Sequence, residues 1–254
     1  MRKLLITILA LTLVSLALWV GHRMSSQIPG VDKPPVAVPV PDPDSYQVTS
    51  GEMEYHRKKL LADYQAARTT AERKAVVQSA RDLLELSLPE MMRCWCGTPW
   101  DFNGTATIPG EGKIACGYFV STVMRDAGFR VERVRLAQQP SQHILRTFLP
   151  RQELTIRAGT QYDAFMDSVR GRPHGIYIIG LDKHVGFLVH NSDGLRFIHS
   201  GGLLNRVVDE SQLKAHSIKI SNYRVIGNIT GNDEVIRKWL FGKKFPTYRK
   251  GAQS

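Results

Sequence analysis

The chain of 254 residues is poor in cysteine: it has three, and all of them fall between positions 94 and 116. This scarcity excludes the disulfide framework of small secreted domains. Cys94 and Cys96 are one residue apart, so a bridge between them would be strained, and we expect free or partly buried thiols there. No second pair of ligands accompanies them and no H-E-x-x-H motif occurs. We therefore expect no metal site and no cofactor.

Acidic residues are also few, with 23 Asp and Glu against 34 Lys and Arg, which gives a formal net charge of +11. Such a charge favours an anionic environment: a cell-wall polymer, anionic lipid or nucleic acid. The stretch Gly110–Lys113 resembles a phosphate loop, but Thr107 and Ile114 occupy its first glycine and its Ser/Thr positions, which excludes one. We expect no specific nucleic-acid partner.

One long apolar run is present, from Leu4 to Val20, and it follows two basic residues. This pattern is typical of export. Two interpretations of residues 1–23 stay open. Small residues at Ser15 and Ala17 suit a cleaved signal peptide, whereas the length of the run suits an uncleaved anchor that would hold the protein to the membrane. In both cases the rest of the chain is expected to be extracytoplasmic, either periplasmic or at the cell surface. No cysteine follows the run, which excludes a lipid-modified terminus.

Residues 24–48 are rich in proline, which favours a stiff extended spacer over a domain. A tether is the favoured interpretation, and a Pro-rich recognition motif is the alternative. Residues 49–250 are long enough for one domain with a sizeable core. Their last part, 236–250, interleaves six cations with four aromatic residues. It could bind a membrane surface or a polyanion, but a terminal helix with its aromatics packed inward is the favoured interpretation.

Helical patterns come first in the domain and strand patterns follow. A capping box of Thr69 and Glu72 begins one helix, Pro89 is expected to end it, and Gly128 is a suitable residue to end another. The expected helices are 51–68, 69–88, 116–128, 141–148 and 160–169. The expected strands are 175–180, 184–190, 195–199 and a further pair within 216–229. This order predicts an α+β fold with an antiparallel sheet.

Cys116 lies where a glycine-rich loop turns into an apolar helix. The unpaired N–H groups and the dipole of a helix N-terminus favour a thiolate, so we expect a lowered pKa. The thiol should point toward the sheet on which the helix packs. His184 and His199 lie on that sheet, at the start of one strand and at the end of the next. A thiol, an imidazole base and a group that orients the base are the parts of an acyl-transfer site.

The register of the hairpin decides whether the two histidines meet. If a four-residue loop, 191–194, joins the strands, His190 pairs with Leu195, and His199 falls opposite Gly186 as a diagonal neighbour of His184 on the same face. A register shifted by two residues would place the histidines directly opposite each other. A two-residue loop at 193–194 would separate them.

The segments "GTPWDFNG", "ACGYFVSTVMRDAGF" and "HVGFLVHNSDGLRFIHSGG" resemble the NlpC-type superfamily of cell-wall cysteine peptidases and amidases. The resemblance covers roughly residues 72–202. It implies a reduced papain-like fold, with N-terminal helices and the nucleophile helix packed on an antiparallel sheet. It also implies that Cys116 is the nucleophile, His184 the base and His199 the third member of the triad.

Some positions depart from the family's pattern. Ala115 stands where the family usually has Asp, Gly117 where it usually has Ser, and Trp100 near a frequent Tyr. With Asp101, these are the residues expected to contact substrate. The 68-residue gap between Cys116 and His184 is longer than usual, so residues 130–173 are expected to add a lid or a substrate wall.

The sequence thus predicts an exported cysteine hydrolase that cleaves an amide bond, in peptidoglycan stem peptides, through an acyl-enzyme. Two alternatives stay open. One is a catalytically silent wall-binding module of the same fold. The other is an amidase or acyltransferase that acts on a lipid or a small molecule.

Overall fold

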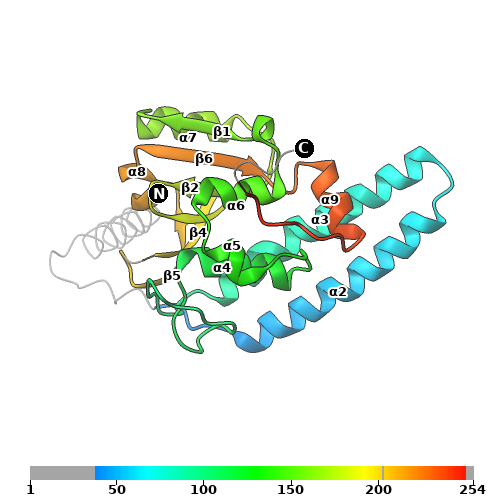
Figure 1. Ribbon diagram of the computed structural model, residues 1–254, viewed down its shortest axis with the longest axis horizontal. Coiled ribbons are helices and arrows are strands. Elements are labelled where there is room, and N and C mark those ends of the chain that lie inside the picture. Colours follow the sequence, from blue (N-terminus) through cyan, green and yellow to red (C-terminus); the bar gives the residue numbers. More distant parts are fainter. Residues whose placement is uncertain (1–37, 202, 250–254) are drawn as a thin grey trace, which may run out of the picture. The chain divides into compact units, whose positions relative to one another are not determined.

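The computed structural model describes residues 38–201 and 203–249. These residues form eight α-helices, one short 3-10 helix and a six-stranded sheet (Figure 1). The predicted α+β class and antiparallel sheet are confirmed. Among the residues described, no helix is both long and apolar enough to cross a membrane. The apolar run Leu4–Val20 lies outside them.

The first two helices form a long antiparallel hairpin, α2 (Pro43–Ala66) and α3 (Thr70–Cys94). Helix α2 begins within the segment expected to be a linker, 24–48. Asp42 caps it by accepting the N–H of Ser45, and Pro43 stands in the first turn, where a missing N–H costs nothing. Tyr46 is buried and its hydroxyl donates to Asp126 at 2.9 Å. Residues 43–48 therefore belong to the domain, and the linker boundary is corrected.

Helix α3 starts at the predicted capping box, where Thr69 and Glu72 bond each other's backbone N–H groups. The prediction that Pro89 ends this helix is wrong, since α3 continues to Cys94. Pro89 removes one helical hydrogen bond, but it lies among buried Leu88, Met91 and Met92. Packing of this last turn outweighs the local cost of the proline.

Four helices occupy the middle of the chain: α4 (Cys116–Asp126), α5 (Arg133–Ala137), α6 (Ser141–Phe148) and α7 (Tyr162–Arg170). A 3-10 turn covers Arg151–Glu153. The predicted helices at 116–128, 141–148 and 160–169 are present. Gly128 has a φ of +91°, and its N–H bonds the carbonyl of Arg125 just after α4 ends.

All five strand pairings are antiparallel, in the order β1-β6-β2-β3-β4-β5. The strands are β1 (Thr155–Ala158), β2 (Gly175–Leu181), β3 (Val185–Asn191), β4 (Gly194–Gly201), β5 (Arg206–Ser211) and β6 (Tyr223–Asn228). Strands β1 and β5 were not predicted. The pair expected within 216–229 is instead a helix, α8 (His216–Ile220), followed by β6, which lies between β1 and β2 in the sheet.

The β3–β4 hairpin has the first of the three registers considered, with His190 opposite Leu195. The four-residue loop expected with it is corrected: the loop has two residues, Ser192 and Asp193, because Asn191 also pairs with Gly194. The same register places Gly186 opposite His199: a side-chain carbon at Gly186 would lie 2.7 Å from the Cβ of His199. The two alternative registers are therefore excluded.

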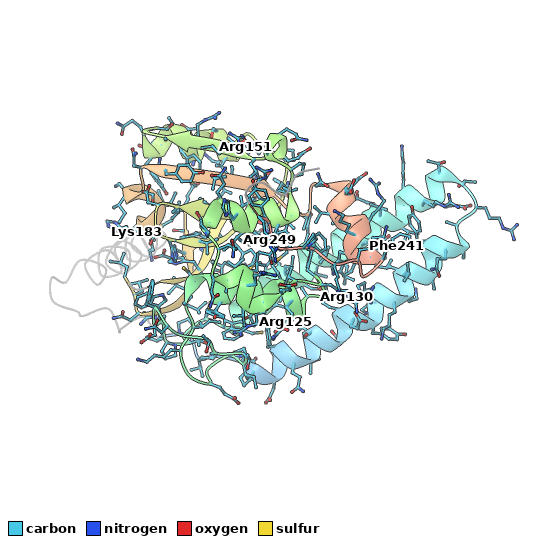
Figure 2. The ribbon with its side chains drawn as sticks, in the orientation of Figure 1. Arg125, Arg130, Arg151, Lys183, Phe241 and Arg249 are labelled. Carbon is cyan, nitrogen blue, oxygen red and sulfur yellow. The ribbon has the colours of Figure 1, made fainter. Side chains whose placement is uncertain are left out.

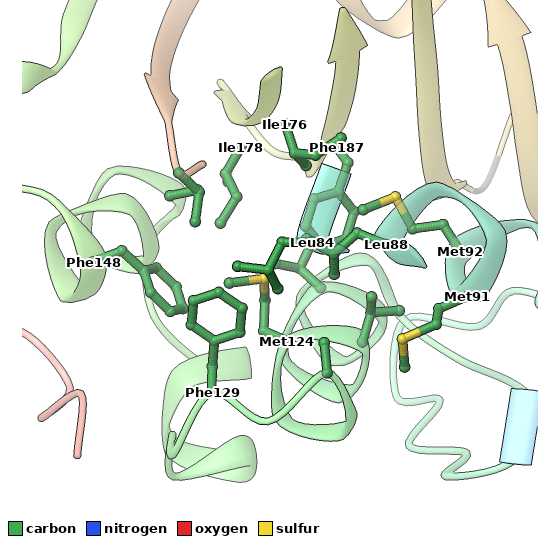
Figure 3. Packing of buried hydrophobic residues seen from close by; sticks show 14 of the residues in the cluster. Leu84, Leu88, Met91, Met92, Met124, Phe129, Phe148, Ile176, Ile178 and Phe187 are labelled. Atoms are coloured by element: carbon green, nitrogen blue, oxygen red, sulfur yellow. The ribbon is translucent and has the colours of Figure 1, made fainter. Parts of the chain in front are cut away.

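Both faces of the sheet are covered. Helices α3 and α4 pack on one face, where Phe119 meets Phe187 edge to face with ring centroids 5.9 Å apart. Figure 3 shows Leu84, Leu88 and Met124 in this core, next to Phe187. Helices α7 and α8 cover the other face in a second cluster. The core thus holds α4, which begins with Cys116, against β3 and β4.

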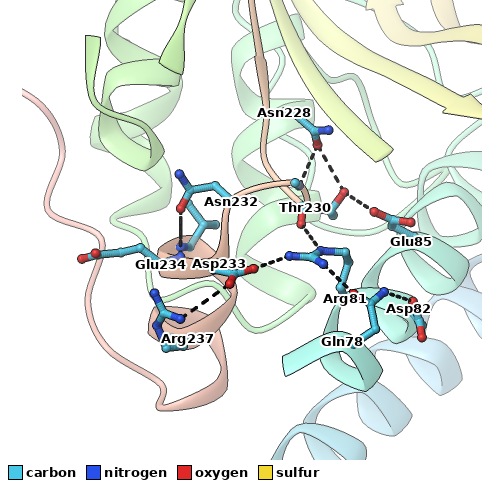
Figure 4. A network of polar contacts seen from close by, with 12 residues as sticks. Gln78, Arg81, Asp82, Glu85, Asn228, Thr230, Asn232, Asp233, Glu234 and Arg237 are labelled. Atoms are coloured by element: carbon cyan, nitrogen blue, oxygen red, sulfur yellow. Dashed lines mark hydrogen bonds and ion pairs between the residues drawn. The ribbon is translucent and has the colours of Figure 1, made fainter. Parts of the chain in front are cut away.

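The end of the described chain packs two of its four aromatic side chains inward, as favoured from the sequence, whereas Phe241 is exposed and Tyr248 is half-buried. Trp239 of α9 (Asp233–Leu240) and Phe245 are buried, and the indole N–H of Trp239 donates to the carbonyl of Ala127 at 2.7 Å. A polar network also joins α9 to α3: Arg81 contacts Thr230 and Asp233 (Figure 4). Helix α9 is thereby fixed beside the end of α4.

Candidate active site

Cys116 is the first residue of α4, and its thiol lies beside the start of β3. Ala115 precedes it as the N-cap, and the carbonyl of Ala115 accepts the N–H of Phe119 at 2.8 Å. Alanine offers no side-chain acceptor, so no cap competes for the N–H groups of the first helical turn. These N–H groups stay directed at the thiol and at whatever approaches it.

The net shift of the thiol pKa is opposite to the one predicted. Burial raises the pKa of Cys116, and the backbone N–H groups of Val185, Gly117 and Cys116 itself lower it only in part. Removal of the thiolate from water outweighs the helix terminus here. In the free protein the neutral thiol therefore prevails at neutral pH.

His184 and His199 form a direct hydrogen bond, Nε2 to Nδ1, at 2.8 Å, with their rings nearly perpendicular. His184 is the last residue of the tight turn between β2 and β3, which closes with the N–H of Leu181 donating to its carbonyl. His199 is only 2% exposed. Burial, and secondly repulsion from His199, lower the pKa of His184 to about 3. His184 is thus a neutral imidazole at physiological pH.

The thiol and His199 approach the end of β3 from different faces of the sheet. His199 alternates with Phe197 along β4, and their rings stack with centroids 4.1 Å apart. Phe197 belongs to the face covered by α7 and α8, whereas α4 covers the other. The expectation of a thiol above the face that carries both histidines is therefore corrected. His184 stands in the turn at the strand end, where it bonds His199 and lines the same cavity as Cys116.

Two glycines make room for the histidine pair. A side-chain carbon at Gly201 would lie 2.8 Å from Nδ1 of His199, and one at Gly186 would lie 2.7 Å from its Cβ. No larger residue fits at either position without moving the imidazole.

Cys116 and His184 line the same cavity, of about 180 Å³. Its wall is formed by the start of α4, the segment between α5 and α6, and the β2–β3 turn. The residues are Cys116, Gly117, Ala137, Gln139, Pro140, Ser141, Ile144, Leu181, Asp182, Lys183, His184 and Val185. Residues 137–144, from the stretch expected to add a substrate wall, thus form one side of it. Figure 2 shows Lys183 on the β2–β3 turn, at the ends of these two strands.

The thiol of Cys116 and the imidazole of His184 are not hydrogen-bonded to each other. Among the described residues, no hydrogen bond joins the sulfur of Cys116 to His184, and Nδ1 of His184 has no partner. Because Nε2 of His184 is already bonded to His199, Nδ1 is the ring nitrogen left to receive a proton.

Of the residues expected to contact substrate, Gly117 lines the cavity and Ala115 is next to it as the N-cap. Trp100 and Asp101 do not line the cavity. The N–H of Trp100 donates to the carbonyl of Asn205, which ties its loop to the β4–β5 connection. The carboxylate of Asp101 accepts the N–H of Asn103 and lies 3.4 Å from Nζ of Lys113.

One residue of the site was missed. Glu210 on β5 reaches His199, with Oε2 3.0 Å from Nε2. No strand was expected at 206–211, so the residue pattern alone does not bring Glu210 near the histidines. The signal that would have found it is strand parity: Val208 is opposite His199, and Glu210, two residues on, shares that face.

Comparison with protein-family models, with curated proteins and with solved structures finds no match. The assignment of the site therefore depends on its own geometry. All three cysteines are free, as expected for Cys94 and Cys96. Within residues 38–201 and 203–249, no group of three or more His, Cys, Asp or Glu could hold a metal ion. Four larger hollows in the described part of the chain, of about 420 to 770 Å³, contain none of the residues Cys116, His184 and His199.

Proposed function

We propose that the protein is an exported cysteine hydrolase that cleaves an amide bond in peptidoglycan stem peptides, on a reduced papain-like fold. One observation carries the proposal: a helix-terminal thiol, Cys116, shares a small cavity with His184, and His184 is hydrogen-bonded to His199. Cys116, His184 and His199 thus follow one another as the nucleophile, the base and the group that orients the base. The resemblance of the sequence to the NlpC-type superfamily gives the same three roles.

In the first step, the sulfur of Cys116 attacks the amide carbonyl while its proton passes to Nδ1 of His184. Both groups are neutral in the free protein, so we expect transfer to accompany attack, with no ion pair formed beforehand. The N–H of Cys116 stabilises the oxyanion that forms on the carbonyl oxygen.

In the second step, the tetrahedral intermediate collapses and the C–N bond breaks. His184 gives its proton to the departing nitrogen, which leaves a thioester on Cys116. Water then attacks the thioester as His184 takes a proton from it, and collapse releases the carboxylic acid and restores the thiol.

The size of the cavity suits a substrate of which only a part enters it. Typical ligand sites hold about 300–1,000 Å³, so a cavity of about 180 Å³ takes the scissile amide and one small side chain. The remaining peptide would lie along the outer surface. The formal charge of +11 favours approach to a polyanionic wall.

A silent wall-binding module is the second candidate, and the missing hydrogen bond between Cys116 and His184 favours it. A binding module would hold stem peptides without cutting them. Its signature would be retention of wall fragments that is equal for the wild type and for a Cys116→Ala variant.

The test is mass spectrometry of muropeptides after digestion of purified wall. We expect the wild type to release peptides with a new amino terminus, and Cys116→Ala and His184→Ala to release none. Cys94→Ser is the matched control, because that thiol lies outside the cavity. Equal release by Cys116→Ala would end the hydrolase proposal. Transfer of the acyl group to an added amine in place of water would indicate the acyltransferase alternative.

A further inference from the structure

The polar chain that starts at His184 does not end at His199. Glu210 on β5 continues it, because Val208 pairs with His199 across the β4–β5 ladder and Glu210 shares their face. Its Oε2 is 3.0 Å from Nε2 of His199. The side chains of His199 and Glu210 are 3% and 12% exposed, so water competes little for this contact.

The carboxylate of Glu210 has His199 as its hydrogen-bond partner. In the part of the chain that the structure describes, no Lys or Arg pairs with it, although the protein is strongly basic. Its neighbour Asp209 instead takes Arg93 and Arg196. A largely buried carboxylate with an imidazole as its partner is a feature of sites where a histidine must keep one tautomer.

We infer that Glu210 is a positioning residue that sets the tautomers of both histidines and so makes Nδ1 of His184 the base. This inference rests on the proposed function for its catalytic meaning, but the tautomers themselves can be measured without substrate.

The argument follows from which atoms can donate. A carboxylate can only accept, so Nε2 of His199 carries the proton that faces Glu210. In a neutral imidazole the other nitrogen is then bare, so Nδ1 of His199 accepts from Nε2–H of His184. His184 therefore keeps a lone pair on Nδ1, the ring nitrogen that has no hydrogen-bond partner among the described residues, and His184 lines the cavity that also holds Cys116. In the reverse order of protons, Nδ1 of His184 would be protonated and could not take the proton of Cys116.

The isosteric Glu210→Gln variant removes the preference for one order of protons along the two histidines. A glutamine amide can accept through its oxygen or donate through its nitrogen, so both orders of protons become possible with almost unchanged shape. Glu85→Gln is a matched control, since Glu85 is also half-buried but accepts from the hydroxyl of Thr230, far from the histidines in sequence.

The experiment is long-range ¹H–¹⁵N NMR of the protein labelled at its histidines, which distinguishes Nε2–H from Nδ1–H imidazoles. We expect Nε2–H for both His184 and His199 in the wild type and in Glu210→Gln a mixed or inverted state. A wild-type His184 in the Nδ1–H form, or Glu210→Gln spectra identical to the wild type, would overturn the inference.

Kinetics then separates the inference from the proposed function. With a cleaved wall peptide as substrate, Glu210→Gln should lower kcat roughly 10-fold to 100-fold with little change in KM, and Glu85→Gln should change neither. An unchanged kcat would also overturn it. If no wall peptide is cleaved by the wild type, the hydrolase proposal fails, while the NMR result still decides the role of Glu210.

Discussion

Acid should destabilise this protein through one imidazole. The pKa of His184 is lowered from 6.5 to about 3 in the folded protein, chiefly by burial. Below pH 6.5 the unfolded chain binds a proton at this residue and the folded chain does not. The stabilising effect of the neutral, buried imidazole is thus fully present above pH 6.5 and is lost progressively as the pH falls toward 3.

The size of the loss in the free energy of unfolding follows from the single proton that the unfolded chain binds at His184. Each pH unit between the two pKa values changes the free energy of unfolding by about 1.4 kcal/mol. Between pH 6.5 and about pH 4.5 the loss from His184 is about 2 kcal/mol, because half of the unfolded chains already carry the proton at the upper limit. A folded pKa one unit higher hardly alters this figure, since the imidazole would still be mainly neutral at the lower limit.

The assay is urea unfolding at a series of pH values for the wild type and His184→Gln, whose amide has no proton to bind in this range. The wild-type midpoint should fall by roughly 1 M more than that of the variant between these limits. Two parallel pH profiles would refute the reasoning. They would mean that His184 is protonated in the folded protein and cannot be a neutral base at its Nδ1.

Three further predictions address the site and its surroundings. In urea titrations, Gly117→Ser should lower the free energy of unfolding by about 1–3 kcal/mol, because an added carbon would lie 2.2 Å from a carbonyl oxygen of α5. Gly51→Ala has open space around the added carbon, so it should raise the free energy of unfolding by about 0.5–1 kcal/mol. Tyr46→Phe should cost about 1–3 kcal/mol in the same assay through the lost bond to Asp126, and no cost would mean that residues 43–48 are a linker after all. Iodoacetamide should alkylate Cys116, in a protein whose other cysteines are serine, roughly tenfold faster per pH unit from pH 7 to 9, since burial raises the pKa of this thiol; a rate that has levelled off by pH 7 would indicate a preformed ion pair.

Local patterns predicted much of the fold. The capping box at Thr69, Gly128 after α4, and the β-rich runs at 184–190 and 195–199 were informative because each reports a preference of a few neighbouring residues. The same patterns misled at Pro89, where the proline signals a helix end and the core keeps the helix intact. Strand β1 was missed for a related reason: it has four residues and pairs only with β6, nearly 70 positions away.

The amino-acid sequence by itself determined the α+β class, the helices α3, α4, α6 and α7, the strands β2, β3 and β4, and the identity of Cys116, His184 and His199 as candidates. All of these depend on short-range spacing, which left three registers of the β3–β4 hairpin open. Tertiary structure alone decided the direction in which the pKa of the Cys116 thiol shifts, the face of the sheet on which His199 lies and the contact between His199 and Glu210. A pKa depends on how much water the whole fold removes, and a strand partner is chosen by the sheet. The thiol pKa that burial raises against the preference of the helix terminus is the clearest case, since no local pattern encodes how deeply a residue is buried.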